Sequence, residues 1–136
     1  IDKVEGSRPV RMGSMIGNTG PLYCTGVGKA ILAFLPEAER GRLLAEIVFT
    51  ACTPKTITGR EELETELAGI RCRGYAVDDC EHEPGVFCVA APVFDSLGGV
   101  AGAVSVSGSE LYLRDGQECI AAQVTAAARS ISELLR

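Results

Sequence analysis

The sequence has no tryptophan among its 136 residues, and only 5% of them are aromatic. It also lacks any apolar run near the roughly 20 residues that a bilayer-spanning helix needs, and no signal-peptide pattern opens the chain. We therefore expect a cytoplasmic protein with no membrane partner. The length fits one compact domain, in which 16 glycines favour close backbone packing over bulky aromatic contacts.

Positive charge is also scarce. Lysine and arginine total 13 against 18 aspartates and glutamates, so the net charge is -5. A nucleic-acid surface needs clustered basic side chains to displace phosphate counterions, so this segment should not bind DNA by itself. The six cysteines occur singly, without a CxxC pair, and we expect reduced thiols because a domain of this size needs no disulfides.

The common catalytic and nucleotide-binding motifs are absent. No GxSxG nucleophile elbow occurs, and Tyr23 and Ala30 stand where a phosphate loop needs Gly and Ser or Thr. A dinucleotide fingerprint fails as well, because Ile31 occupies the position of its third glycine. We predict neither an enzyme nor a bound cofactor.

Hydrophobic periodicity predicts a series of helices. The segment TGVGKAILAFL has apolar residues at helical spacing, with Thr25 as its N-cap. A second helix is expected over about 36–48. A third should begin at a capping box of Thr58 and Glu61 and end at Gly74.

The C-terminal segment predicts a longer helix, for which Asp115 and Glu118 form a second capping pair. The apolar stripes expected to be buried are Val27, Ala30, Ile31 and Phe34 in the first helix, Leu43, Leu44 and Ile47 in the second, Leu63, Leu67 and Ile70 in the third, and Ile120, Val124, Ala127, Ile131 and Leu134 in the last.

Extended runs account for most of the remainder. They are expected over 1–5, 10–16, 75–79, 86–95 and 100–107, and a hairpin turn over 96–99 should join the last two. Because these runs follow one another without regular helical crossovers, we predict an α+β fold. It has a mainly antiparallel sheet, flanking helices and a long C-terminal helix.

Strand alternation gives two of these strands a bulky face and a small, weakly polar face. The small faces consist of Val86, Cys88, Ala90 and Pro92 on one strand and Ala101, Ala103, Ser105 and Ser107 on the next. If these faces are flush, they form a hollow edged by hydroxyls and a thiol, as in a small-ligand site. The alternative is that they face solvent.

Two further features leave alternatives open. The amides at Gly26 and Gly28 either bind a small anion at a helix start or only allow close packing. Cys80, His82 and Cys88, with or without Asp78, offer zinc-type ligands, although their spacing matches no standard zinc motif and a solvated acidic loop is the plainer interpretation.

Taken together, the segments PLYCTGVGKAILAFLP, TPKTIT, RGYAVDD, EPGVFCVAAPVFD and AGAVSVSG resemble, in order and spacing, the C-terminal effector-binding domain of IclR-family bacterial transcription regulators. The resemblance runs over 1–136. It implies a GAF-like domain that binds a small metabolite, often a carboxylate, with a DNA-binding winged helix-turn-helix domain upstream. The chain would then be N-terminally truncated, and DNA would be bound only through the missing domain.

The resemblance also implies an oligomer and a ligand pocket. The expected assembly is a homodimer or a dimer of dimers, and the expected effector is a small organic acid. Matching the family pattern position by position assigns ligand contacts to Met12, Gly26, Val27, Asp78, Val86, Cys88, Ser105 and Ser107. In that assignment the acidic half of DDCEHEPGVFCVAAPV is loop and rim, with Asp78 turned inward. The rival functions are a metal-binding protein using Cys80, His82 and Cys88, and a domain used mainly for oligomerisation.

Overall fold

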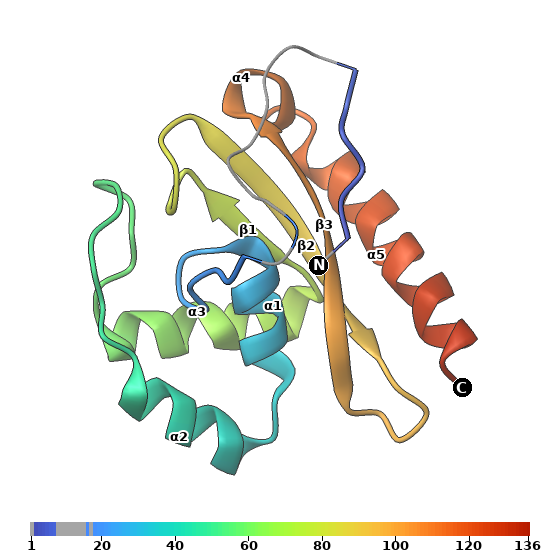
Figure 1. Ribbon diagram of the computed structural model, residues 1–136, viewed down its shortest axis with the longest axis horizontal. Helices are drawn as coiled ribbons and strands as arrows, with labels where there is room; N and C mark the ends of the chain where they lie inside the picture. The colour runs from blue at the N-terminus through green and yellow to red at the C-terminus, as the bar shows by residue number, and fades with distance from the viewer. Residues whose placement is uncertain (1, 8–15, 17) are drawn as a thin grey trace.

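The structure is a computed structural model that describes residues 2–7, 16 and 18–136. Its described part is an antiparallel three-stranded sheet, ordered β1-β2-β3, with helices on both faces (Figure 1). The elements are α1 (Gly26–Phe34), α2 (Glu37–Glu46), α3 (Arg60–Arg73), β1 (Ala76–Asp79), β2 (Val86–Phe94), β3 (Val100–Ser109), α4 (Glu110–Leu113) and α5 (Gln117–Leu134). The predicted α+β architecture is therefore confirmed.

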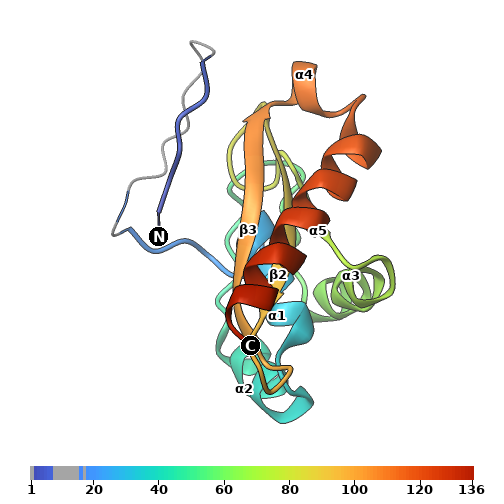
Figure 2. The same cartoon turned by 90° about the vertical axis from the view of Figure 1, so that its right-hand side faces the viewer.

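The sheet forms as alternation predicts. Strands β2 and β3 make a hairpin, closed where the Asp95 amide donates to the Gly99 carbonyl at 2.9 Å. Gly98 has a φ of 81°, a left-handed conformation that favours glycine in such a turn. Strand β3 runs to Ser109, two residues past its predicted end, and passes directly into the short helix α4, which the sequence did not predict (Figure 2).

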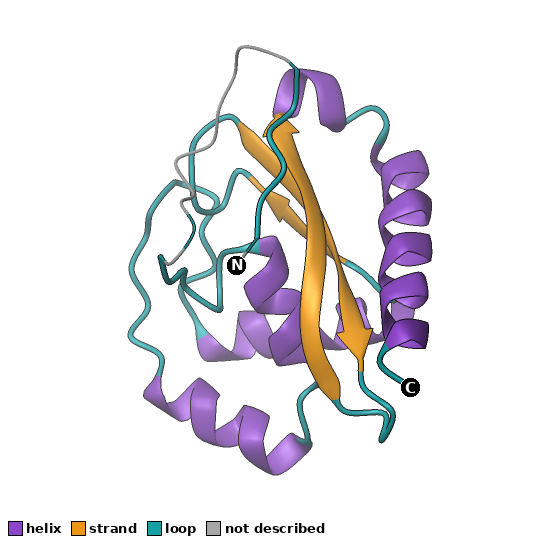
Figure 3. Ribbon diagram, turned by 45° about the vertical axis from the view of Figure 1, so that its right-hand side comes forward, coloured by secondary structure: helices purple, strands orange, loops and turns teal. Residues whose placement is uncertain are grey.

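The strands lie between α5 on one face and α1, backed by α3, on the other (Figure 3). The bulky sheet face contacts α5 through Phe87, Val89 and Val93. On the opposite face Ala76 and Ala90 join the larger core, whose fully buried large helical side chains are those of Leu32, Leu63, Leu67 and Ile70. The predicted buried stripe of α3 is confirmed.

Two predicted helix ends are also confirmed. The Thr25 hydroxyl accepts the Gly28 amide at 3.1 Å and caps α1. Gly74 ends α3 at a φ of 87°, and its amide donates to the Ile70 carbonyl at 2.8 Å. A left-handed residue at this position lets the last carbonyls of a helix find donors, and glycine adopts it without steric cost.

The two predicted capping pairs are wrong. Helix α3 begins at Arg60 with Gly59 as N-cap, and α5 begins at Gln117 with Gly116 as N-cap. Neither cap carries a side-chain hydrogen bond, because a glycine occupies the position where Thr58 or Asp115 was expected. Acidic residues still lie in the first turn of each helix, where they complement the dipole.

The buried faces of α1 and α2 differ from the prediction. In α1, Val27, Ile31 and Phe34 are only partly buried, whereas Lys29 is 1% exposed. Because the helix lies between the sheet and α3, it is enclosed on more than one side, which a single apolar stripe does not describe. In α2, Leu44 alone of the predicted stripe is buried.

In α5 the predicted stripe is largely wrong. Ala127, Ile131 and Leu134 are exposed, and the buried residues are Ala121, Val124, Ala128 and Ser132. The sheet face below α5 already carries large side chains, so small residues allow the helix to approach it. Burial leaves the Ser132 hydroxyl satisfied, because it accepts the Phe94 amide at 2.9 Å and donates to the Ala128 carbonyl at 2.8 Å.

The N-terminal prediction is only partly testable. Residues 2–7 belong to no strand, contrary to the extended run expected over 1–5. Most of the run expected over 10–16 lies outside the described residues. Within the described part of the chain, no helix has the length and apolar character needed to cross a membrane.

Candidate functional site

The small faces of β2 and β3 lie on the same side of the sheet. Cys88 pairs with Ser107 and Ala90 with Ser105, and Asp78 of β1 pairs with Cys88 from the other edge. Residues directly opposite in an antiparallel sheet share a face. Asp78, Cys88 and Ser107 therefore form a row across all three strands, with a thiol between a carboxylate and a hydroxyl.

The N-terminus of α1 packs on this row. A Cβ placed on Gly26 would lie 3.3 Å from the Cβ of Ala90 and 3.4 Å from the Cβ of Cys88, so only glycine allows this approach without displacement. Within the helix, the Thr25 hydroxyl and carbonyl accept the amides of Gly28 and Lys29. The two preceding amides, which no intrahelical carbonyl can reach, are those of Gly26 and Val27.

Asp78 is 3% exposed and already has partners in the protein. Its Oδ1 accepts the Glu81 amide at 2.7 Å, which fixes the start of the β1–β2 loop. Burial raises the pKa of this carboxyl, while the amides of Glu81 and His82 and the charge of Lys29 oppose the rise. A carboxylate has about four acceptor positions, so these amides leave part of its capacity for another donor.

Cys88 is buried in the middle of the row. Burial raises the pKa of its thiol to about 12, a hydrogen bond from Ser107 opposes the rise, and the charge of Asp78 adds to it. The thiol is therefore neutral near pH 7 and acts as a polar contact, because the nucleophilic form of cysteine is the thiolate.

The other predicted ligand contacts have different surroundings. Val27 and Val86 are half-buried, and Val86 lies opposite Ser109 on the same side as Cys88. Ser105 is exposed on β3. Met12 lies outside the described residues.

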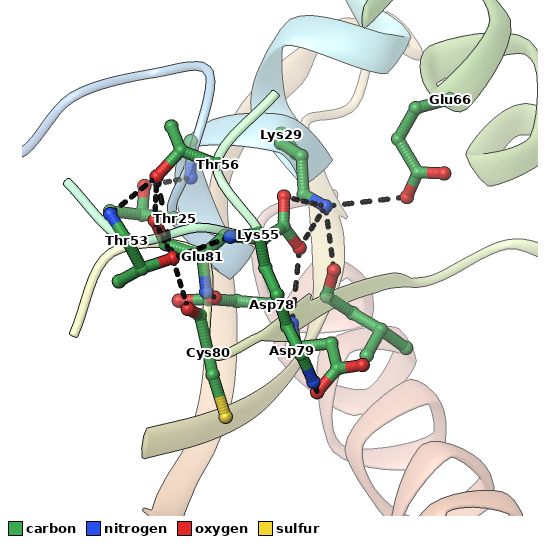
Figure 4. Close-up of polar contacts among 12 residues, drawn as sticks. Thr25, Lys29, Thr53, Lys55, Thr56, Glu66, Asp78, Asp79, Cys80 and Glu81 are labelled. Atoms are coloured by element: carbon green, nitrogen blue, oxygen red, sulfur yellow. Dashed lines mark hydrogen bonds and ion pairs between the residues drawn. The ribbon is translucent and has the colours of Figure 1, made fainter. Parts of the chain in front are cut away.

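A buried ion pair that sequence reasoning missed lies beside the row. The Lys29 Nζ donates to both carboxylate oxygens of Glu81, at 2.8 and 2.9 Å, and to the Val77 carbonyl at 2.6 Å (Figure 4). It also lies 3.3 Å from Oε1 of Glu66. Burial raises the pKa of Glu81, and the charge of Lys29 opposes that rise.

The TPKTIT segment, residues 53–58, forms hydrogen bonds to the β1–β2 loop that contains Glu81. The Thr53 hydroxyl donates to the Cys80 carbonyl at 2.7 Å and the Thr56 hydroxyl to the Glu81 carbonyl at 2.6 Å (Figure 4). Cys80 has a φ of 55°, an uncommon conformation for a residue with a side chain. Glu81 is therefore buried at 6% exposure and is not part of a solvated rim, which corrects that prediction.

The sequence contains one indication of this ion pair, at Lys29. Lys29 interrupts an otherwise apolar helix, and a lysine enclosed by packing needs a carboxylate partner. What the sequence does not indicate is that the partner is Glu81 rather than its neighbours.

The metal set considered from the sequence is not assembled. Among the described residues, the groups of ligand-type side chains that lie close together are Cys24, Cys52 and His82, and separately Asp79, Cys80 and Glu110. The alternative set of Cys80, His82 and Cys88 is thus divided. His82 belongs to the first group and Cys80 to the second, while Cys88 lies beside Asp78 and Ser107.

The whole chain matches a known domain. Residues 1–133 match the family described as Bacterial transcriptional regulator IclR C-terminal. The chain is 38% identical over 136 residues to the Uncharacterized HTH-type transcriptional regulator RhmR of Escherichia coli, covering 99% of this chain and 52% of that protein. The chain therefore belongs to the IclR family of transcriptional regulators and corresponds to its C-terminal domain, which confirms the resemblance.

Solved structures agree. The crystal structure of the Thermotoga maritima IclR superposes with a TM-score of 0.84 at 38% identity, covering 96% of this chain and 55% of that one. The C-terminal domain of the Escherichia coli regulator KdgR gives a TM-score of 0.82 at 36% identity, covering 88% and 74%. The chain spans about half the length of the curated relatives it matches, and these relatives are transcriptional regulators, not enzymes.

Proposed function

We propose that this domain senses a small organic acid and passes the binding signal to a DNA-binding winged helix-turn-helix domain upstream of it. The observation that carries the proposal is the packing of the α1 amide end against Cys88, the middle residue of the row that also contains Asp78 and Ser107. Helix N-termini favour anions, and a few polar groups beside small side chains give a ligand its orientation.

Each group has a chemical role in this proposal. The amides of Gly26 and Val27 hold the ligand carboxylate, and the hydroxyls of Ser105 and Ser107 contact its polar substituents. Asp78, whose acceptor capacity is only partly used, accepts a hydrogen bond from a ligand hydroxyl. Met12, Val86 and Cys88 complete the proposed wall.

The same contacts offer a route by which binding affects the rest of the domain. Asp78 holds the Glu81 amide, and Glu81 binds Lys29 of α1, so a ligand between α1 and β1 contacts both ends of one hydrogen-bonded chain. Coupling needs only that the ligand favour one arrangement over another, typically by about 1–3 kcal/mol.

We also propose a homodimer or dimer of dimers. Leu111 of α4 is 83% exposed, Leu134 of α5 is 84% exposed, and Leu135 just after α5 is 47% exposed; burying such apolar surface between subunits would be favourable. Light scattering at several concentrations tests this separately from ligand binding, and a monomer at every concentration would reject it.

The sensing proposal is tested by a thermal-shift screen against small carboxylates such as glyoxylate, pyruvate, hydroxybenzoates, phenylacetates and sugar acids. A ligand at a hundred times its Kd adds about 2.7 kcal/mol, which corresponds to a rise in Tm of about 9 °C for a chain of this length. Ser105→Leu should abolish the shift by filling the space above β3.

The matched control is Ser130→Leu, an equal substitution at an exposed position on α5, which should keep the shift. A selective hit that Ser105→Leu leaves intact would place the ligand elsewhere and reject the proposed contacts. A selective hit that is lost in Asp78→Asn would further indicate a hydroxy acid, because that variant keeps one side-chain oxygen to accept the Glu81 amide and replaces the other oxygen with a donor.

A further inference from the structure

A second group of side chains, separate from the proposed carboxylate contacts, brings together two thiols and the only imidazole of the chain. Cys24 directly precedes the cap of α1, Cys52 opens the TPKTIT loop, and His82 lies in the β1–β2 loop. One ligand atom from each lies within 4.8 Å of the other two. The Sγ of Cys24 is 3.7 Å from Nδ1 of His82.

These separations fit a single tetrahedral metal ion. Zinc binds thiolate sulfur at about 2.3 Å and imidazole nitrogen at about 2.0–2.1 Å, so two ligands at the tetrahedral angle stand about 3.6 Å apart for S and N and about 3.8 Å for two S atoms. The Cys24–His82 distance of 3.7 Å is already close to that value, and the Cys52 sulfur lies within 4.8 Å of both other ligand atoms. Two thiolates and one imidazole are also the donor types that zinc prefers.

The three ligands are held by structure that does not depend on a metal. The Cys52 amide donates to the Thr56 hydroxyl at 3.0 Å, and that hydroxyl donates to the carbonyl of Glu81, the neighbour of His82. One threonine thus fixes two of the three ligand-bearing segments relative to each other. A site with such preset positions loses little conformational entropy when a cation binds.

The burial of the three side chains and the access to them also suit a metal site. Cys24 is fully buried, His82 is half-buried and Cys52 is exposed, so a cation can enter from the Cys52 side. Burial, together with the neighbouring Cys52, raises the pKa of the Cys24 thiol to about 12.

The other group, Asp79, Cys80 and Glu110, already has its cation. Arg114 Nη2 lies 2.6 Å from the Asp79 carboxylate, 2.5 Å from the Glu110 carboxylate and 3.9 Å from the Cys80 sulfur. A guanidinium placed at the centre of these groups leaves no position for a metal ion.

We propose that Cys24, Cys52 and His82 form a Zn²⁺ site with three protein ligands and a fourth position open to water or another small ligand. On binding, each thiol gives up one proton as its Zn–S bond forms, and the imidazole binds in its neutral form, so two protons are released per zinc. The site uses none of the proposed carboxylate contacts as a metal ligand, and neither proposal needs the other.

The test uses reduced protein purified without a polyhistidine tag and titrated with Zn²⁺ against a competing chelator, and with Co²⁺ as a spectroscopic substitute. We expect one equivalent of zinc per chain. With Co²⁺ we expect a thiolate-to-metal charge-transfer band and the intense d–d absorption of a tetrahedral site. Cys52→Ser and His82→Gln should each weaken binding by more than the about 10–100-fold that loss of an outer-shell partner costs.

Cys52→Ser is the main variant because Cys52 is exposed and its removal should leave the fold intact, as circular dichroism would verify. Cys72→Ser, at another exposed thiol, and Cys80→Ser, in the group held by Arg114, are the controls and should bind zinc as the parent protein does.

The proposal is overturned if no zinc binds under reducing conditions, or if Co²⁺ shows no thiolate band. It is equally overturned if Cys52→Ser and His82→Gln titrate like the parent, or if Cys80→Ser is the variant that removes binding. A Cys24–Cys52 disulfide in unreduced protein, with no zinc bound after reduction, would assign the pair to redox chemistry and also reject the metal site.

Discussion

Replacing Lys29 with methionine removes the cation from a buried carboxylate and should strongly destabilise the domain. Methionine keeps the length and apolar stem of lysine, so the loss of charge dominates. Removing one partner of a buried ion pair costs about 3–5 kcal/mol, because the remaining charge has no compensation. For a chain of this length, that loss corresponds to a fall in Tm of roughly 10–17 °C.

The assay is urea unfolding followed by circular dichroism, arranged as a double-mutant cycle with Glu81→Gln. The double variant leaves a neutral amide beside the apolar side chain, so it should be more stable than Lys29→Met alone. The exposed Lys55, 3.3 Å from Asp79, supplies the control, and Lys55→Met should cost no more than about 1 kcal/mol. A Lys29→Met loss as small as the control, or no recovery in the double variant, would refute the inference that the pair is held in a low-dielectric interior.

The remaining predictions concern packing and thiol reactivity. Gly28→Ala should lower the Tm, because its Cβ would lie 2.7 Å from the backbone of the preceding turn, whereas Gly41→Ala, with open space around it, should raise stability by about 1 kcal/mol. If Gly28→Ala raises the Tm as Gly41→Ala does, the close approach at α1 is wrong. Iodoacetamide should alkylate exposed Cys72 well before Cys88, whose thiol is buried and has a pKa of about 12. Peptide mass spectrometry over time measures the order, and equal rates would show that the β2 face opens readily.

The sheet was predictable from sequence because alternation is a local property. Each of the three strands of the sheet lies within two residues of its predicted bounds, whereas the strand pairing was needed to show that the small faces are flush. The caps were less predictable: a Thr or Asp followed by Glu at capping spacing fits the pattern, yet a glycine one residue later took the N-cap at both helices.

Side-chain partners across long sequence separations could not be predicted. Lys29 and Glu81 are 52 residues apart, and the distance between Cys24 and His82 in the sequence is 58. No periodicity relates such positions, because the turn at Cys80 and the TPKTIT loop decide which loop residue faces α1. The C-terminal part of the buried face of α5 was missed because hydrophobicity favoured Ile131, whereas the buried residues there are Ala128 and Ser132.

The contact between Gly26 and β2 has a consequence for the size of ligand that the proposed site would accept. Since Gly26 has no side chain, the Cβ atoms of Ala90 and Cys88 set how closely the start of α1 approaches β2. A larger side chain at position 90 would move the N-terminus of α1 away from the sheet, and glycine there would let it come closer. At the proposed ligand site, the size of the molecule admitted would thus be governed by a residue that need not touch it.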